Sequence, residues 1–266
     1  KASIIDNSAK ALLGKINTTT DKQDLQQTWQ LLTSNFNTVT QSIEGVNQLR
    51  QTLLQLAVQG RLSKKWREDN PNLELASQLI NLVNSENEKI KATYKLRNQK
   101  VLLEITKEEV LFEIPDTWSW YRLGNLLYTT SGGTPSRGNT DYWGGDIPWL
   151  KSGELTDGLI LLDTEEKITE LGHKESATYL FPKGTLLIAL YGATAGRLGV
   201  LTYPSTTYQA ICGFFTNPHI LTDYLFYYLW AFRSKIVSES WGQAQPNISQ
   251  DYLKKFCFAL PPYKEQ

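Results

Sequence analysis

A seven-residue recurrence of apolar side chains constrains the N-terminal part of this chain more than any other feature. The first series consists of Leu25, Leu32, Val39, Val46 and Leu53. A second series starts four residues later and consists of Trp29, Phe36, Ile43, Arg50 and Ala57. Because this spacing places a narrow stripe on one face of a helix, it predicts a long coiled-coil-type helix over residues 21–62. Gly60 is a natural stop for this helix.

A helix over residues 25–57 is about 50 Å long, and it cannot bury its stripe alone. Two alternatives are open: the helix packs against its own domain, or it pairs with another helix as a spacer or dimerisation rod. The strict recurrence favours the second alternative. We therefore expect a helix–helix contact formed by Leu25, Trp29, Leu32, Phe36, Val39, Ile43, Val46 and Leu53.

The rest of the chain divides by composition. Residues 1–20 form a polar N-terminal segment, and the charge-rich stretch 63–114 is predicted as a helical connector with a helix near 72–99. The apolar side of that helix is predicted to consist of Leu75, Leu79, Leu82, Val83 and Ile90. Residues 115–266 carry short apolar runs between turn residues, which predict strands, and one helical stretch at 221–240. The fold class is therefore α+β, a domain with a twisted mixed or antiparallel sheet and flanking helices attached to a long helix.

Composition excludes several classes of protein. Lys and Arg number 27 and so do Asp and Glu, so the chain has no net positive charge with which to attract nucleic acid in bulk. No uninterrupted apolar stretch is long enough for a membrane-spanning helix, and we expect no membrane partner. Two isolated cysteines exclude a disulfide framework. The chain contains no Met, from which we expect a piece of a longer protein.

Four motifs that suggest catalysis each lack a required group. A Pro-Pro-Tyr sequence follows Leu260, where an amino-methyltransferase needs a hydrogen-bond acceptor in place of Leu. Asp157 with Glu165–Lys167 matches nuclease metal sites only loosely. The Gly192–Arg197 turn lacks the Lys-(Ser/Thr) pair of a phosphate-binding loop. The two histidines have no metal-ligand neighbours at the required spacing. We therefore expect no catalytic residue and no metal site.

Four loops of residues 115–266 are instead rich in hydrogen-bond donors. This region holds 12 Lys and Arg against 14 Asp and Glu, so its cations are few and individually placed. Arg137, Lys151 and Arg197 are candidates for phosphate or guanine contacts. Glycines allow close backbone approach, hydroxyls give supporting hydrogen bonds, and amides can pair with adenine. These further candidates are Ser131, Gly132, Gly133, Thr134, Ser136, Ser152, Tyr191, Thr194, Gln245 and Asn247.

The order of several segments resembles the specificity subunit of type I restriction–modification systems. The segments are TWSWYRLGNL, SGGTPSRGNTDYWGGDIPWLKSGEL, FPKGTLLIALYGATAGRLGVL, QAIC and GQAQPNISQDYLKKFCFALPPYKEQ. They resemble a target-recognition domain over residues 115–266. Upstream, LRQTLLQLAVQGRLSKKWREDNPN resembles the end of the family's spacer helix. Because only one such helix and one such domain are present, the resemblance extends to about half of a specificity subunit.

The resemblance implies a non-catalytic, cytoplasmic subunit that reads one half of a split target in double-stranded DNA. It implies partners as well: methyltransferase subunits that carry S-adenosylmethionine, and a restriction and translocase subunit that uses ATP and Mg²⁺. This chain itself is expected to hold no cofactor. A half-unit is expected to form a homodimer through the spacer helix, whose length of about 50 Å matches about 15 base pairs. The alternative is an oligomerising protein-interaction scaffold without DNA sequence specificity.

Overall fold

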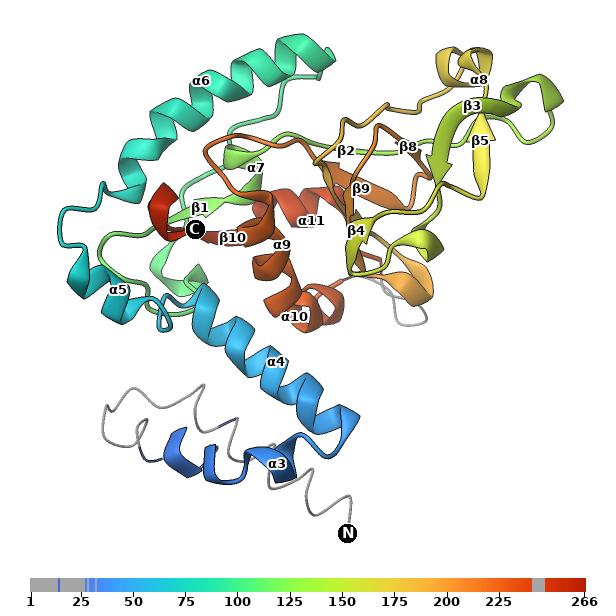
Figure 1. Cartoon of the computed structure of the whole chain (residues 1–266). Coiled ribbons are helices and arrows are strands. Elements are labelled where there is room, and N and C mark those ends of the chain that lie inside the picture. Colours follow the sequence, from blue (N-terminus) through green and yellow to red (C-terminus); the bar gives the residue numbers. More distant parts are fainter. Residues whose placement is uncertain (1–13, 15–26, 28, 32, 241–246) are drawn as a thin grey trace. The chain divides into compact units, whose positions relative to one another are not determined.

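The computed structural model describes residues 14, 27, 29–31, 33–240 and 247–266. The chain forms two compact units, Lys1–Pro71 and Asn72–Gln266 (Figure 1). The second unit includes residues 72–114 in addition to the predicted domain at 115–266. Each unit is described separately below.

The first unit interrupts the helix that the heptad pattern predicts over residues 21–62. It contains α3 (Phe36–Val39), α4 (Ile43–Val58) and α5 (Lys64–Asp69). Ser42 is extended (φ −118°, ψ 150°), and its hydroxyl accepts a hydrogen bond from the Gly45 amide at 2.9 Å, so it caps α4. A Cβ at Gly45 would lie only 1.9 Å from the Val39 carbonyl oxygen. The expectation of one unbroken helix is therefore wrong: a serine cap and a close approach at glycine turn the chain at residues 40–42.

The predicted stripe remains largely exposed on this chain. Val39 is buried, but Ile43 is 83% exposed and Leu53 is 36% exposed. Trp29, Phe36 and Val46 are also exposed, whereas Leu25 and Leu32 lie outside the described residues. Gly60 has a positive φ of 68° just beyond the end of α4, which confirms the predicted stop.

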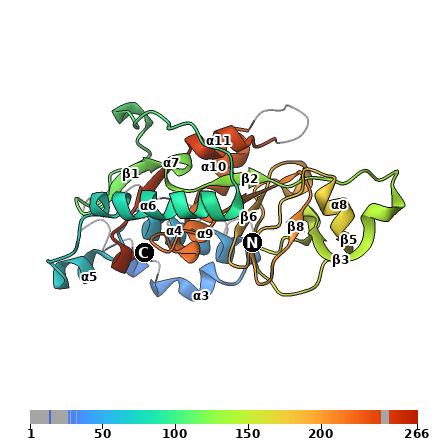
Figure 2. The ribbon, with the colours of Figure 1, turned by 90° about the horizontal axis from the view of Figure 1, so that it is seen from above.

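The second unit begins with α6 (Ala76–Tyr94), a single straight helix in Figure 2. Its buried residues are Ala76, Leu79, Val83, Asn87 and Ile90, whereas the predicted apolar residues Leu75 and Leu82 are exposed. Asn87 Nδ2 donates to the Leu126 carbonyl at 2.9 Å, and Asn217 Nδ2 donates to Asn87 Oδ1 at 3.0 Å. These buried hydrogen bonds attach α6 to the rest of the unit.

The main sheet has five strands in the order β2-β9-β6-β7-β4. Its strands are β2 (Thr129–Ser131), β9 (Ile211–Phe214), β6 (Leu186–Ala189), β7 (Leu198–Leu201) and β4 (Gly158–Ile160). Neighbours are antiparallel except for β4 and β7, which are parallel. All residues of β6 and β9 are buried, which explains why these strands read as continuous apolar runs.

Two smaller sheets complete the β structure. One has the order β5-β3-β8 and consists of β5 (Glu166–Ile168), β3 (Trp143–Leu150) and β8 (Thr206–Thr207). In it β3 pairs antiparallel with β5 and parallel with β8. The other is the antiparallel pair β1 (Ser119–Arg122) and β10 (Cys257–Leu260). The predicted α+β class with a mixed sheet is confirmed by this pairing.

Five helices follow α6 in the described part of the second unit and pack against its sheets. They are α7 (Leu123–Leu126), α8 (Glu170–Lys174), α9 (Thr222–Ala231), α10 (Arg233–Ser238) and α11 (Gln250–Lys255). In Figures 1 and 2, α9, α10 and α11 lie beside the five-stranded sheet, and α8 lies with β3 and β5 at its opposite end. Short 3-10 turns are Lys107–Glu109, Thr140–Tyr142, Ser152–Glu154, Gly192–Thr194 and Tyr263–Glu265.

The predicted single helix over 221–240 is split at Phe232. This residue leaves the helical region (φ −100°, ψ 7°). Its ring stacks on Phe112 with centroids 5.9 Å apart and makes a tilted contact with Tyr228 at 4.9 Å. Within the described residues every helix is too short or too polar to span a membrane.

Replacing Asn87 by Ala is expected to lower the free energy of unfolding by about 1–3 kcal/mol, because it leaves the buried Leu126 carbonyl without its donor. The matched control is Asn84→Ala on the same helix, where the side chain is exposed. The control is expected to change stability by less than about 0.7 kcal/mol. Urea unfolding of both variants measures the difference. Equal stability of the two variants would contradict the role given to Asn87.

Candidate functional site

The loop at residues 131–137 is attached by backbone hydrogen bonds to two other strands. The Gly132 amide donates to the Ile211 carbonyl at 3.0 Å, and the Gly133 amide donates to the Thr207 carbonyl at 2.9 Å. The buried Trp149 indole donates from Nε1 to the Gly133 carbonyl at 2.9 Å. The base of the loop is therefore held in place by β9, β8 and β3.

The two glycines of this loop are required by contacts within the chain. A Cβ at Gly132 would lie 2.1 Å from the Thr207 carbonyl oxygen, and one at Gly133 would lie 2.6 Å from the Ala177 carbonyl carbon. Both distances are below 3.0 Å, a separation that Cβ atoms in proteins essentially never show. The close backbone approach that glycine permits here is to the chain's own strands and loops.

Four aromatic rings form a continuous row beside the loop. The Tyr191 and Tyr208 ring centroids are 6.4 Å apart, those of Tyr208 and Trp149 are 5.7 Å apart, and those of Trp149 and Trp143 are 5.0 Å apart. We call Tyr191, Tyr208, Trp149 and Trp143 the aromatic row. The Arg137 guanidinium lies 3.7 Å from the centroid of Trp143 at the end of the row, a cation–π contact. The row brings together residues from three segments: β3, the turn after β6 and the segment after β8.

Two of the predicted cations lie in an ion-pair network beside this row. Arg137 pairs with Glu166, and Lys151 pairs with Glu165 at 2.5 Å and with Glu166 at 3.3 Å. Hydrogen bonding to Arg137, reinforced by Lys151, lowers the pKa of Glu166. Hydrogen bonding to Glu165 raises the pKa of Lys151. Both shifts favour the charged forms of Glu166 and Lys151, and each cation already has an anionic partner.

Several of the other predicted residues surround the aromatic row. The Thr134 hydroxyl bonds to Gln209, and the Ser136 carbonyl accepts a hydrogen bond from Trp143 Nε1 at 3.2 Å. Ser131 ends β2, and Ser152 begins the 3-10 turn directly after Lys151. Tyr191 and Asn247 form an isolated antiparallel bridge, which brings the last predicted loop to the row. Gln245 lies outside the described residues.

Arg197 is placed differently from Arg137 and Lys151. Its guanidinium donates to the Leu155 carbonyl at 3.5 Å, and its amide donates to the Thr194 carbonyl at 2.8 Å. Asp157, weighed above as part of a nuclease-like motif, pairs with Arg233 and caps the Leu198 amide at 2.9 Å. Thr194 ends the 3-10 turn that directly follows Tyr191 of the aromatic row, whereas the Arg197 guanidinium is directed to the Leu155 carbonyl.

Sequence reasoning missed four residues of this surface: Trp143, Glu166, Tyr208 and Gln209. Tyr208 and Gln209 follow β8, whose parallel pairing with β3 joins residues far apart in the sequence. No local pattern predicts such a pairing. One signal was available in the sequence: Trp143 and Trp149 lie on either side of the start of a predicted strand. Placing both rings on the same face of that strand also requires knowledge of the register shift between Trp143 and Ile147, which the sequence does not reveal.

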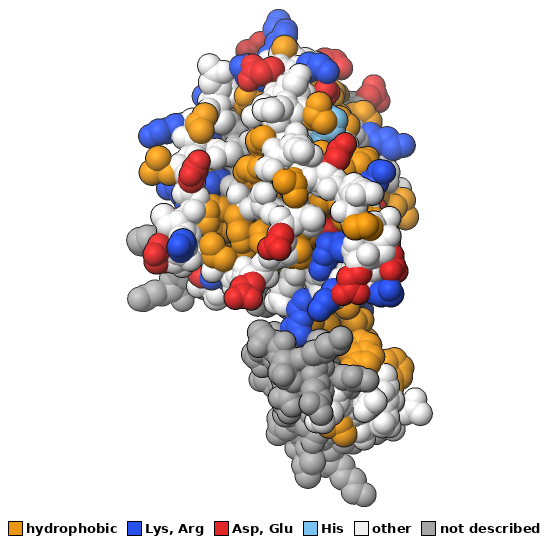
Figure 3. Space-filling model, turned by 90° about the vertical axis from the view of Figure 1, so that its left-hand side faces the viewer, with side chains coloured by type: hydrophobic (Ala, Val, Ile, Leu, Met, Phe, Trp, Pro, Cys, Tyr) orange, Lys and Arg blue, Asp and Glu red, His pale blue; other side chains and the backbone are white. Residues whose placement is uncertain are grey.

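Charge is spread evenly over the face shown in Figure 3, where Lys and Arg side chains alternate with Asp and Glu. That face, the left-hand side of Figure 1, lies opposite β3 and β5 and shows no broad cationic area. Among the described residues no group of three His, Cys, Asp or Glu side chains has the arrangement of a metal site. The chemistry that this site offers is hydrogen bonding, ring stacking and a small number of ion pairs.

Comparison with known families identifies the relatives of this chain. A family model described as the type I restriction modification DNA specificity domain matches residues 115–266, which is more than half of the chain. The chain belongs to this family. Membership in a DNA specificity family agrees with the resemblance noted above and does not favour the protein-interaction scaffold.

Named members of the type I specificity family are similar to the chain over longer stretches. The type I restriction enzyme MjaIX specificity subunit of Methanocaldococcus jannaschii is 30% identical over 167 residues, which cover 60% of this chain and 38% of that protein. The EcoEI specificity subunit of Escherichia coli is 26% identical over 283 residues, covering 95% of this chain and 44% of that protein. A solved HsdS subunit from Thermoanaerobacter tengcongensis aligns with a TM-score of 0.45 at 15% identity, covering 81% of this chain and 47% of that one. The chain therefore spans less than half the length of each of these relatives.

The Tyr191 hydroxyl provides a pH-dependent test of the aromatic row. Burial, reinforced by a hydrogen bond to Tyr208, raises the pKa of Tyr191 to about 12. An unfolded tyrosine has a pKa near 10, so the stability that this group contributes is complete below pH ~10 and is lost as the pH rises toward 12. Tyr191→Phe is therefore expected to lose less stability than the wild type over that range.

Urea unfolding at a series of alkaline pH values measures this effect, with Tyr227→Phe as the control because Tyr227 is exposed. The readout is the slope of the free energy of unfolding against pH. Loss of the Tyr191 hydrogen bonds lowers the whole curve by a constant amount, so only the loss of the Tyr191 titration changes its slope. A wild-type slope in Tyr191→Phe would show that Tyr191 is not buried in the row.

Proposed function

We propose that residues 115–266 read one half of a split double-stranded DNA target for a type I restriction–modification complex. The observation that carries this proposal is the family match over the whole of this region. The geometry supports it, because the aromatic row and the loop at 131–137 collect hydrogen-bond donors, rings and two cations on one surface. In this proposal Arg137 contacts a base edge and Lys151 a phosphate.

The ion pairs of the site suggest how recognition avoids indiscriminate binding. In the free chain Glu166 forms ion pairs with both Arg137 and Lys151. DNA must therefore replace a carboxylate partner before either cation gains an interaction. A guanine offers Arg137 the O6 and N7 acceptors together, whereas an incorrect base leaves the guanidinium better paired with Glu166. The exchange makes binding depend on sequence more than on total charge.

The partners follow from the same proposal. Methylation belongs to methyltransferase subunits that carry S-adenosylmethionine and extrude the target adenine from the duplex. Cleavage and translocation belong to a restriction subunit that uses ATP and Mg²⁺. This chain supplies target recognition and docking in the cytoplasm, and its own residues carry out no covalent step.

The direct test compares a duplex selected from a random-sequence pool by the wild-type chain with a scrambled duplex. Arg137→Ala is expected to reduce the preference for the selected duplex about 5- to 150-fold, which corresponds to about 1–3 kcal/mol for a bidentate base contact. Arg137→Lys is expected not to restore the preference, because an ammonium cannot make the planar two-point contact. Competition binding assays at one fixed salt concentration measure it.

The charge-matched control is Lys167→Ala, which removes one cation on β5 that pairs with Asp163 outside the aromatic row. It is expected to leave the preference unchanged. If Arg137→Ala weakened binding to both duplexes equally, Arg137 would be a phosphate contact and the base-reading role would be wrong. If the wild type showed no preference for any duplex, the proposed function would fail.

We propose further that two copies of the chain associate through the exposed stripe of α4, which presents Ile43, Val46 and Leu53 to solvent. Association buries apolar area that a single copy leaves in water. Leu53→Asp is expected to convert the dimer to a monomer, whereas Asn47→Asp adds the same charge at an exposed polar position of the same helix and leaves the dimer intact. Light scattering gives the molar mass of each. A monomeric wild type, or a dimeric Leu53→Asp variant, would contradict this proposal.

A further inference from the structure

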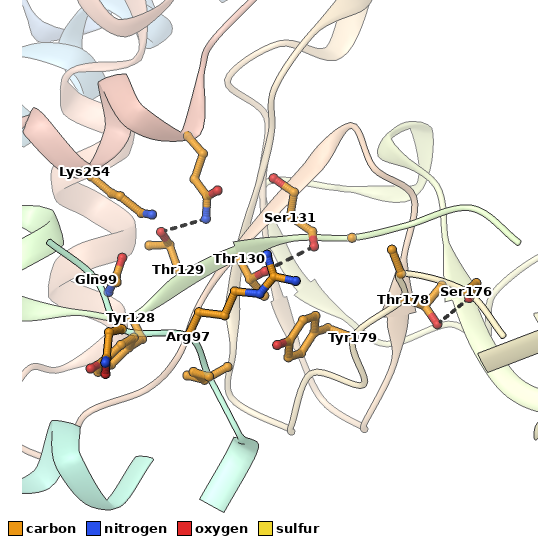
Figure 4. A pocket seen from close by; sticks show the side chains of 15 residues that line it. Arg97, Gln99, Tyr128, Thr129, Thr130, Ser131, Ser176, Thr178, Tyr179 and Lys254 are labelled. Carbon is orange, nitrogen blue, oxygen red and sulfur yellow. Dashed lines mark hydrogen bonds between the residues drawn. The ribbon is translucent and has the colours of Figure 1, made fainter. Parts of the chain in front are cut away.

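A pocket of about 480 Å³ lies at the foot of the loop at 131–137. Its walls come from the segment after α6, from β2, from the loop before β6 and from α11 (Figure 4). The residues with polar side chains in these walls are Arg97, Asn98, Gln99, Tyr128, Thr129, Thr130, Ser131, Ser176, Thr178, Tyr179, Gln250 and Lys254. Sequence reasoning assigned a role to only one of them, Ser131. The pocket therefore adds a surface that the recognition proposal does not use.

The lining of the pocket is cationic and rich in hydroxyls. Two of its residues, Arg97 and Lys254, carry positive charge, and none carries a carboxylate. Figure 4 shows the Arg97 side chain directed toward Thr130 and the Lys254 ammonium directed toward Thr129. Among the described residues neither cation has an ion-pair partner, in contrast to Arg137 and Lys151. Two unpaired cations that converge on one hollow favour an anionic ligand.

The hydroxyl groups are oriented to complete such a site. Thr129 Oγ1 accepts a hydrogen bond from Gln250 Nε2 at 3.1 Å, which joins β2 to α11 in the wall of the pocket. Ser131 ends β2, the edge strand of the main sheet. A phosphate group needs donors on several of its oxygens at once, and this combination of guanidinium, ammonium and hydroxyl donors supplies them.

We propose that this pocket holds a backbone phosphate of the DNA whose bases are read at the aromatic row. The inference rests on the proposed function, and it assigns Arg97 and Lys254 as positioning contacts. Ser131 and Gly132 belong both to the pocket and to the recognition loop. The Cα atoms of Ser131 and Arg137, six residue steps apart, lie at most about 20 Å from each other. This is the length of about six base pairs at about 3.4 Å of rise each, so the phosphate and the base at Arg137 belong to the same short stretch of duplex.

The salt dependence of DNA binding tests this assignment. Arg97→Ala and Lys254→Gln are each expected to weaken binding of the selected and the scrambled duplex by the same factor. Each is expected to make the negative slope of log affinity against log salt shallower by about 0.9, the value for one lost phosphate contact. Arg97→Lys keeps the charge and is expected to keep the slope. Lys254→Gln retains the side-chain stem, which packs close to Gly124.

The control is Lys89→Ala, which removes the same charge from an exposed ion pair on α6. If Arg97→Ala and Lys254→Gln showed the same slope as this control while the wild type still preferred the selected duplex, the pocket assignment would be overturned. The proposed function would then still stand. Reduced slopes without any sequence preference in the wild type would support the pocket and refute the proposed function. A wild type that binds neither duplex would refute both.

Two further outcomes bear on the nature of the ligand. An effect of Arg97→Ala on the selected duplex alone would mean that the pocket reads bases, which contradicts a backbone phosphate. Calorimetry with inorganic phosphate separates the free ion from the polymer. If Arg97→Ala abolished phosphate binding but left both DNA slopes unchanged, the pocket would be a site for a free anion and the proposal would be wrong.

Discussion

The hydrogen bond from the Trp149 indole to the Gly133 carbonyl joins the loop at 131–137 to the aromatic row, on the surface proposed for recognition. Trp149 is only 1% exposed and lies on β3, so its position is set by the sheet. Its N–H fixes the base of the loop at 131–137, while its ring contacts Trp143 and Tyr208. A buried indole N–H needs a partner, and here that partner is the loop. Loop position and ring stacking are therefore linked through one side chain.

The two cations of this surface can contact DNA only by exchanging an ion pair that they already make within the chain. The chain has no net charge, and Arg137 and Lys151 are both occupied by Glu166. In the proposed mechanism, recognition replaces one set of charge pairs with another, so sequence discrimination comes from the difference between them. The pocket with Arg97 and Lys254 has the opposite character, because neither cation forms an ion pair within the part of the chain that the structure describes. In this account the pocket contributes affinity that is independent of sequence, and the aromatic row contributes specificity.

Local patterns predicted much of the second unit. Runs such as the one at Leu186–Ala189 and the one at Ile211–Phe214 were recognisable as strands because both faces are buried. The loop at 131–137 and Lys151 were predicted from their donors, and the structure places them together. What could not be predicted depends on long-range pairing: Tyr208 reaches the site through the parallel pairing of β3 with β8.

Two further differences have local causes that the patterns did not reveal. The heptad recurrence continues through Ser42, but a serine cap competes with the helix there, and Gly45 permits the turn. Arg97 belongs to the stretch predicted as a helix near 72–99, yet α6 ends at Tyr94 and the chain after it returns toward β2 and α11, so that Arg97 lines a pocket. In both cases the same residues support two structures, and packing decides between them.

Sequencing of methylated bases in cells with and without the gene for this chain shows whether the chain directs methylation to a split DNA motif. Deletion is expected to remove modification from one such motif. A gene carrying Arg137→Ala is expected not to restore modification at that motif, whereas one carrying Lys167→Ala restores it. Identical methylation patterns in cells with and without the gene, in a strain whose methyltransferase subunit is expressed, would contradict the account.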